Sequence, residues 1–123
     1  MAYLRPEERR YLYEYEDLRA YTPRTLTRPE ELESHLAGVR EKAYAIERGE
    51  RFEGAWGIAV PILGSDEKPI LAILCVGSLP LDDETEAEVR SHMLATAQSI
   101  SDHLALVGDL PKPAVDFARF NLE

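Results

Sequence analysis

Two apolar segments separated by a short polar loop constrain the fold of this chain more than any other feature. They run from Trp56 to Leu63 and from Pro69 to Val76, and five residues of turn character, 64–68, connect them. This pattern predicts an antiparallel β-hairpin. Both segments are apolar at nearly every position, so we expect both faces of the hairpin to be covered by helices, a ligand or a partner chain. Pro61 lacks a backbone donor and should lie at an edge or a bulge.

Three segments with apolar residues at helical spacing predict helices before and after this hairpin. We expect the first over residues 4–18, the second from Pro29 to near Ala45, and the third from residue 82 to about Val107. The apolar stripes of the second and third helices should be buried. These stripes are Leu32, Leu36, Val39, Ala43 and Ile46 in the second helix, and Val89, Met93, Ala97, Ile100, Leu104 and Val107 in the third.

Capping signals indicate where the second and third helices begin. Thr27 and Glu30 have the spacing of a capping box around a first-turn proline, and Asp83 and Glu86 have the same spacing. Gly108 is suited to end the third helix.

The order of these elements predicts one domain of mixed α+β class. A chain of 123 residues is long enough to bury a core. We assign residues 1–108 to this domain and residues 109–123 to a C-terminal tail. Phe117 and Phe120 of the tail are expected to cover the domain's own surface, with another chain as the alternative partner.

Composition excludes several classes of function. The formal net charge is −9, from 23 acidic and 14 basic residues, so the average surface repels a phosphate backbone and direct DNA binding is not expected. A single cysteine rules out an internal disulfide framework, and no apolar run reaches the roughly 18 residues that span a bilayer. Without a recognisable leader, the chain is expected in the cytoplasm and not in a membrane.

Side chains capable of catalysis or metal binding do not form a recognisable constellation. Cys75 lies in the middle of a predicted strand and is expected to behave as a small apolar residue. His35, His92 and His103 lack the spacing that places two imidazoles on one ion, so we interpret them as structural or surface residues, the alternative being a metal site completed by carboxylates. No glycine-rich phosphate loop is present. We therefore predict no enzyme activity and no cofactor.

The segment from Tyr44 to Ile62, YAIERGERFEGAWGIAVPI, resembles the central signature of IclR-type effector domains, in which a "gyA" turn leads through a glycine to an "iAaPv" strand. The resemblance extends to the second strand, ILAILCVG at residues 70–77, and upstream to YTPRTLT at residues 21–27, and covers about residues 1–107. It implies a GAF-like antiparallel sheet flanked by helices, with a cavity over the sheet for a small organic effector, in a dimeric or tetrameric regulator.

Two departures from the family pattern concern what surrounds the domain. The family's winged helix-turn-helix is absent, and Met1–Leu4 corresponds to the interior of the family's first long helix. The chain is therefore expected to be a fragment or a shortened paralogue that pairs with a full-length regulator.

The resemblance also implies positions that bind the ligand. Many members carry cysteine or serine before the "iAaPv" strand and serines near the end of the second strand, where this chain has Gly57, Leu74 and Val76. Loss of these hydroxyl and thiol groups predicts an effector less polar than the small organic acids that many relatives bind.

Two further residues are assigned to the ligand site with alternatives. Glu50, together with its neighbour Arg51, could supply a polar contact, the alternative being an exposed loop ion pair between the two. Trp56 is either a wall of the pocket or part of the core.

Two functions remain open on these grounds. The first is a ligand-sensing regulatory domain that oligomerises, alone or with a regulator. The second is an interaction module that no longer binds ligand and pairs through an open sheet edge.

Overall fold

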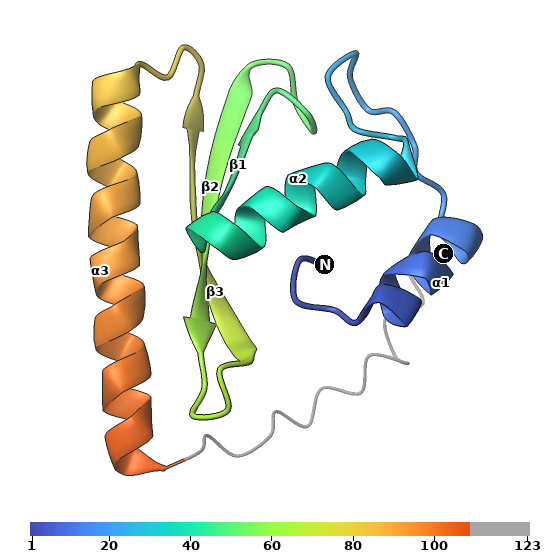
Figure 1. Ribbon diagram of the computed structural model, residues 1–123. Helices are drawn as coiled ribbons and strands as arrows, with labels where there is room; N and C mark the ends of the chain where they lie inside the picture. Colours follow the sequence, from blue (N-terminus) through green and yellow to red (C-terminus); the bar gives the residue numbers. More distant parts are fainter. Residues whose placement is uncertain (109–123) are drawn as a thin grey trace, which may run out of the picture.

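Residues 1–108, which the computed structural model describes, form an α+β domain in which a three-stranded sheet separates a long helix from two shorter ones (Figure 1). The elements are α1 (Pro6–Tyr15), α2 (Pro29–Lys42), β1 (Ala45–Arg48), β2 (Ala55–Leu63), β3 (Pro69–Ser78) and α3 (Asp83–Val107). Both strand pairs are antiparallel, in the order β1-β2-β3. The α+β class and the hairpin predicted from the sequence are confirmed, whereas the tail from 109 to 123 lies outside the described residues.

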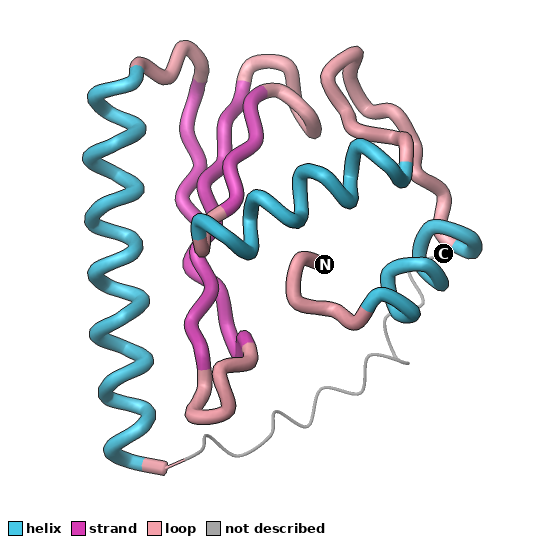
Figure 2. The backbone as a smooth tube through the Cα atoms, viewed as in Figure 1, coloured by secondary structure: helices cyan, strands magenta, loops and turns pink. Residues whose placement is uncertain are grey.

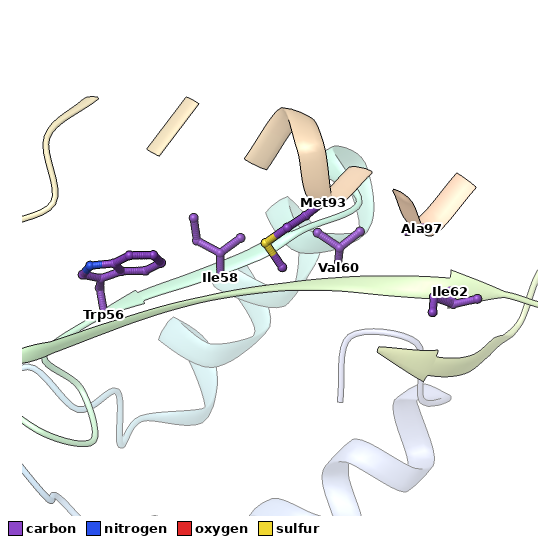
Figure 3. Close-up of a cluster of buried hydrophobic side chains, with 6 residues drawn as sticks. All are labelled: Trp56, Ile58, Val60, Ile62, Met93 and Ala97. Atoms are coloured by element: carbon purple, nitrogen blue, oxygen red, sulfur yellow. The ribbon is translucent and has the colours of Figure 1, made fainter. Parts of the chain in front are cut away.

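The main core lies between the sheet and α3. Side chains alternate across a strand, so every second residue of the central strand β2 faces this helix. Trp56, Ile58, Val60 and Ile62 pack there with Met93 and Ala97 of α3 (Figure 3). Ile58 and Val60 are almost completely buried, and burial of each such side chain contributes roughly 1.5–3 kcal/mol.

The opposite side of the sheet is covered differently. Helices α1 and α2 lie on this side, together with the N-terminus (Figure 2). A small second cluster joins α2 and the N-terminus to the sheet, in which Leu36 and Val39 of α2 pack with Ala2 and with Ala45 of β1. The expectation that both faces of the hairpin are covered is therefore met only in part: α3 buries β2, whereas most of β3 stays exposed and α2 covers the opposite face incompletely.

The predicted end of the second helix is wrong. Helix α2 ends at Lys42, and Ala43 takes a left-handed conformation with φ of 60° while its N–H donates to the Val39 carbonyl. Ile46 belongs to strand β1 and packs against the core, rather than extending the α2 stripe. Pairing of β1 with β2 outweighs the local helical spacing.

The helix starts also differ from the predicted capping boxes. The N-cap of α2 is Arg28, without a side-chain cap, so the Thr27–Glu30 box is wrong. The N-cap of α3 is Asp82, whose Oδ1 accepts a 2.8 Å hydrogen bond from the Thr85 N–H, one residue earlier than expected.

Two further expectations concern single positions. Val107 is 62% exposed, so it does not belong to the buried stripe of α3. Pro61 lies beyond the end of β1 and one residue before a register shift at Ile62 and Leu63, which confirms its predicted place at an edge or bulge.

Candidate functional site

The sheet face that points away from α3 is made of small and apolar residues, with Glu47 as the charged exception. Strand pairing places Glu47 beside Gly57 and Val76, and Ala45 beside Ala59 and Leu74. Glycine and alanine on β1 and β2 leave space above the sheet that larger residues would fill.

Two adjoining hollows occupy this space beneath α2. The loop-side hollow, of about 550 Å³, is lined by His35, Ala45, Ile46, Glu47, Arg51, Phe52, Ala55, Trp56, Gly57, Ala59, Leu74, Val76 and Gly77. The N-terminal hollow, of about 490 Å³, is lined by residues 1–4, by α2 and by the other end of the hairpin. Sites for small molecules typically measure roughly 300–1,000 Å³.

The floor of the loop-side hollow is apolar and exposed. Leu74 is 67% exposed and Val76 is 68% exposed, although both belong to a strand of the sheet. Large apolar side chains that are exposed next to one another indicate a binding surface rather than a purely structural one.

The polar groups of the loop-side hollow come from β1, α2 and the loop after β1. Glu47 lies over Gly57, since a Cβ atom on this glycine would stand 3.5 Å from both Cγ and Oε1 of Glu47. The other carboxylate oxygen, Oε2, accepts a 2.9 Å hydrogen bond from the Glu50 N–H. His35 reaches the hollow from α2.

Glu50 lies beside the hollow and does not line it. Its carbonyl accepts a hydrogen bond from Thr25 Oγ1 at 2.5 Å, and buried Thr22 donates to the neighbouring Gly49 carbonyl at 2.6 Å. Partial burial raises the pKa of the Glu50 carboxyl; His35 opposes this increase and Glu47 adds to it. The segment before α2 thus holds the turn that follows β1.

Arg51 stands at the rim of the hollow between aromatic rings. Its guanidinium carbon lies 3.7 Å from the centre of the Tyr21 ring and 5.2 Å from that of Phe52. Within residues 1–108 neither Arg51 nor Glu50 forms an ion pair, so the loop ion pair considered from the sequence is not formed.

The structure brings together four of the five residues assigned to the ligand site. Gly57, Leu74 and Val76 share the open sheet face. Trp56 lines the hollow as well, but its side chain belongs to the α3-facing core. Glu50 is set back behind Glu47.

Sequence reasoning missed Glu47, Phe52 and His35 as residues that line the hollow. For Glu47 a signal existed, because a strand at residues 45–48 would have paired it with the open Gly57.

The remaining candidate side chains lie elsewhere. Cys75 is half-buried and packs against the α3-facing core, while His92 and His103 are exposed on α3. Across residues 1–108 no three His, Cys, Asp or Glu side chains are grouped so that they could hold a metal ion. In the same part of the chain, no helix is long and apolar enough to cross a membrane.

These features define a class of small α+β domain, in which one sheet face forms a packed core and the other forms the floor of an apolar hollow of ligand size. The chain belongs to the IclR family: residues 1–102 match the family described as bacterial transcriptional regulator IclR C-terminal.

Known relatives agree with this membership. The chain is 28% identical over 81 residues to the uncharacterized HTH-type transcriptional regulator RhmR of Escherichia coli K12, an alignment that covers 65% of this chain and 31% of RhmR. The crystal structure of an IclR transcriptional regulator from Alicyclobacillus acidocaldarius is 30% identical, with a TM-score of 0.77, and the match covers 83% of this chain and 41% of that one.

A third relative shares the fold at lower identity. The inducer-binding domain of a PobR double mutant from Acinetobacter, solved with 3-hydroxybenzoic acid, is 22% identical with a TM-score of 0.73. The match covers 87% of this chain and 60% of that one. The chain thus spans less than two thirds of the length of each of these relatives, from 31% of RhmR to 60% of the PobR domain.

Proposed function

We propose that this chain is a ligand-sensing domain of a transcriptional regulator and that it binds a small, relatively apolar organic effector in the loop-side hollow. The observation that carries this proposal is the apolar floor of Leu74 and Val76, open to a hollow of about 550 Å³. Covering such side chains with a ligand removes apolar surface from water, which stabilises the complex by roughly 25 cal/mol per Å² of apolar surface buried.

Family membership supports the same use of the hollow. The PobR inducer-binding domain was solved with an aromatic acid, and one aromatic ring is within the size range of the hollow. We propose that the Gly57, Leu74 and Val76 surface accepts the apolar part of the effector.

The position of the hollow suggests how binding is transmitted. A ligand above the sheet contacts both the β2–β3 floor and His35 of α2, so it favours arrangements in which α2 is held close to the sheet. Helix α2 is joined to α1 through Arg9 and Glu33, whose closest atoms are 2.7 Å apart. Effector binding would therefore shift the first helix as well, and with it whatever that helix contacts in the regulator.

Thermal unfolding in the presence of candidate metabolites tests this proposal. A ligand that binds the native state raises the melting temperature in proportion to the logarithm of its concentration over the dissociation constant. The effect should disappear in Gly57→Val, which fills the hollow, and persist in Leu106→Phe, which adds bulk at a residue 85% exposed on α3. A folded protein that responds to no aromatic, aliphatic or acidic compound would contradict the proposal.

Our second proposal is that the domain assembles through β3. The same assembly would serve the alternative function, that of an interaction module that binds no ligand. Within residues 1–108 the outer edge of β3 has no neighbouring strand, and none of its ten residues is charged. Ile70 and Leu71 on this strand are 43% and 51% exposed. Unpaired edges of this kind favour pairing with a second copy.

Light scattering after gel filtration tests this assembly. We expect Leu71→Lys to reduce the oligomer, because its charge would lie beside the apolar side chains of the partner strand on the same sheet face, whereas Tyr11→Lys on α1 should not. Unchanged mass in both variants would place the interface elsewhere, and a monomeric wild type at high concentration would contradict the proposal.

The wider biological role is also proposed. We expect a cytoplasmic regulator in which DNA is contacted outside this domain, because its net charge of −9 disfavours a phosphate backbone.

A further inference from the structure

We propose that the C-terminal tail of this chain, residues 109–123, docks into the N-terminal hollow, where Phe117 and Phe120 cover its apolar walls. The sequence predicts that these two phenylalanines cover the domain's own surface, and the described part of the chain offers a place for them. This inference concerns the N-terminal hollow rather than the effector site, so it is independent of the proposed function.

The N-terminal hollow is open and almost entirely apolar. It measures about 490 Å³, and Pro61 of β2 and Ala72 of β3, which pair across the hairpin, form part of its wall. Met1 and Tyr3 also line it, and they are 50% and 37% exposed. An exposed apolar surface of this kind favours contact with other apolar groups, and each phenylalanine that covered it would bury roughly 150–250 Å².

The tail carries the apolar side chains that such a surface requires. They are Leu110, Val115, Phe117, Phe120 and Leu122. Removal of apolar surface from water is the main driving force for contacts of this type, so the tail gains free energy when these side chains cover a surface. The N-terminal hollow and the tail thus satisfy the same need in each other.

Helix α3 ends beside the hairpin loop that closes one end of this hollow (Figure 1). Ala105, near the end of α3, lines a groove together with Glu67 of the loop. The next residue of the loop, Lys68, lines the N-terminal hollow. Phe117 follows Gly108 by nine residues, and a segment of this length spans up to about 30 Å, which is enough to pass around the loop.

Charge also favours the tail at this hollow. Lys68 is the one lysine, arginine, aspartate or glutamate among the described residues that line it. Asp116 directly precedes Phe117, so its carboxylate would lie near Lys68 when the phenylalanine enters the hollow. Lys68 already lies 3.4 Å from Asp66, but both side chains are largely exposed, and an exposed pair of this kind is weak.

Two other hollows suit the tail less well. The groove between α3 and the hairpin loop lies at the same end of the hairpin, but Glu67, Gln98 and Asp102 line it, and these polar groups would lose water when a phenylalanine covered them. The loop-side hollow lies towards Gly77 at the opposite end of β3, and Glu47 places a carboxylate in it.

Docking of the tail would complete the cover of the sheet face that α2 covers incompletely. Leu36 and Val39 of α2 line the same hollow as Pro61 and Ala72 of the hairpin. The phenylalanines would contact both sides of the hollow, so the tail would join the end of α3 to α2 around the end of the sheet.

A spin label on the tail tests where it docks. The full chain with Cys75→Ala and Asn121→Cys has one thiol, to which a nitroxide is attached. We expect the amide NMR signals of residues 1–4, 36–39 and 70–72 to lose intensity, because the nitroxide broadens resonances near it. This loss should persist in a large excess of unlabelled chain, which removes contacts between labelled copies. Cys75→Val replaces Cys75→Ala if the latter folds poorly.

Variants of both surfaces identify the contact. Phe117→Ser combined with Phe120→Ser should abolish the loss of intensity, whereas Arg119→Ser in the same tail should retain it. Ala72→Glu adds bulk and negative charge in the hollow and should release the tail as well. Ser78→Glu is its matched control, because Ser78 is exposed at the far end of the same strand, an even number of residues away and therefore on the same face.

Three results would overturn the inference. Broadening confined to the end of α3 and the hairpin loop would show that the tail does not reach the hollow. A loss of intensity that disappears in excess unlabelled chain would show that the tail docks on a second copy. An unchanged pattern in the double phenylalanine variant would show that Phe117 and Phe120 do not hold the tail. The proposed function would stand in all three cases.

Discussion

Trp56 and Gly77 fit closely against each other on neighbouring strands of the sheet. The indole Nε1 donates to the Ser78 carbonyl at 3.1 Å, and the ring lies against the backbone of Gly77 in the opposite strand. A Cβ atom at Gly77 would stand 2.5 Å from Cζ2 of the indole. Because the ring is rigid and buried, it cannot move away at low cost.

We therefore expect Gly77→Ala to destabilise the domain by about 1–3 kcal/mol through overpacking. Gly54→Ala is the matched control, since a Cβ atom there meets no other atom within 4 Å, and its effect should stay within about 0.5 kcal/mol. Urea denaturation followed by circular dichroism measures both changes. Equal stability of the two variants would show that the indole relaxes around the added methyl group.

Residues of the open sheet face differ in how far sequence could predict them. Gly57, Leu74 and Val76 were found because the family resemblance points to these positions, and strand pairing places them on one face of the sheet. Glu47 was overlooked in favour of Glu50, because residues 45–48 appeared to end a helix. Its position depends on pairing with β2, which is an interaction between segments and leaves little trace in local spacing.

Among the elements, α1 depends on one polar contact with α2. Arg9 is only 7% exposed, and its guanidinium donates to both oxygens of Glu33, at 2.7 and 2.9 Å. Tyr13 adds a hydrogen bond to the same carboxylate at 2.8 Å. Arg9 and Tyr13 lower the pKa of Glu33 from 4.5 to about 2.

This shift predicts an acid-sensitive contact between the two helices. Because the folded pKa of Glu33 lies below its unfolded value, the stabilising contribution is complete above about pH 4.5 and is lost as the pH falls towards about 2. Glu33→Gln should therefore be less stable than the wild type at pH 7, with a difference that shrinks below pH 4.5. Urea unfolding at pH 7, 5, 4 and 3 measures this.

Glu41→Gln, an exposed change on α2, serves as the reference for this experiment and should show no such pH dependence relative to the wild type. A constant difference between Glu33→Gln and the wild type at every pH would indicate that the contact does not depend on the charge of Glu33.

The sequence predicts which helices and strands are present better than it predicts where they begin and end. The three helices and the hairpin follow from strong periodicity, whereas β1, only four residues long, was not recognised. The apolar spacing of α2 continues through Ile46, and only the left-handed turn at Ala43 breaks the helix. Alanine carries no local signal for that conformation, so the break could not be predicted from propensity.

The whole molecule is asymmetric across its sheet. One face is filled by the interlocking side chains of β2 and α3, whereas the other is separated from α2 by hollows. Regions with few buried apolar contacts open at lower free energy than the core.

Hydrogen exchange should reveal this asymmetry. We expect backbone amides of α1 and α2 to exchange well before those of β2 and the middle of α3, because their opening leaves the main core intact. Mass spectrometry of peptides after timed exchange measures the difference. Simultaneous exchange of all four elements would show that the domain opens as one cooperative unit.

Neighbouring residues of β2 serve unrelated purposes, since Trp56, Ile58 and Val60 are part of the core and the intervening Gly57 and Ala59 face the hollow. Heritable change can thus act on one set of codons while the interleaved set stays constant. Point substitutions at the positions that face the hollow can therefore change which ligand is bound without disturbing the packed core. An inserted or deleted codon within β2 would exchange the two roles at once and damage both.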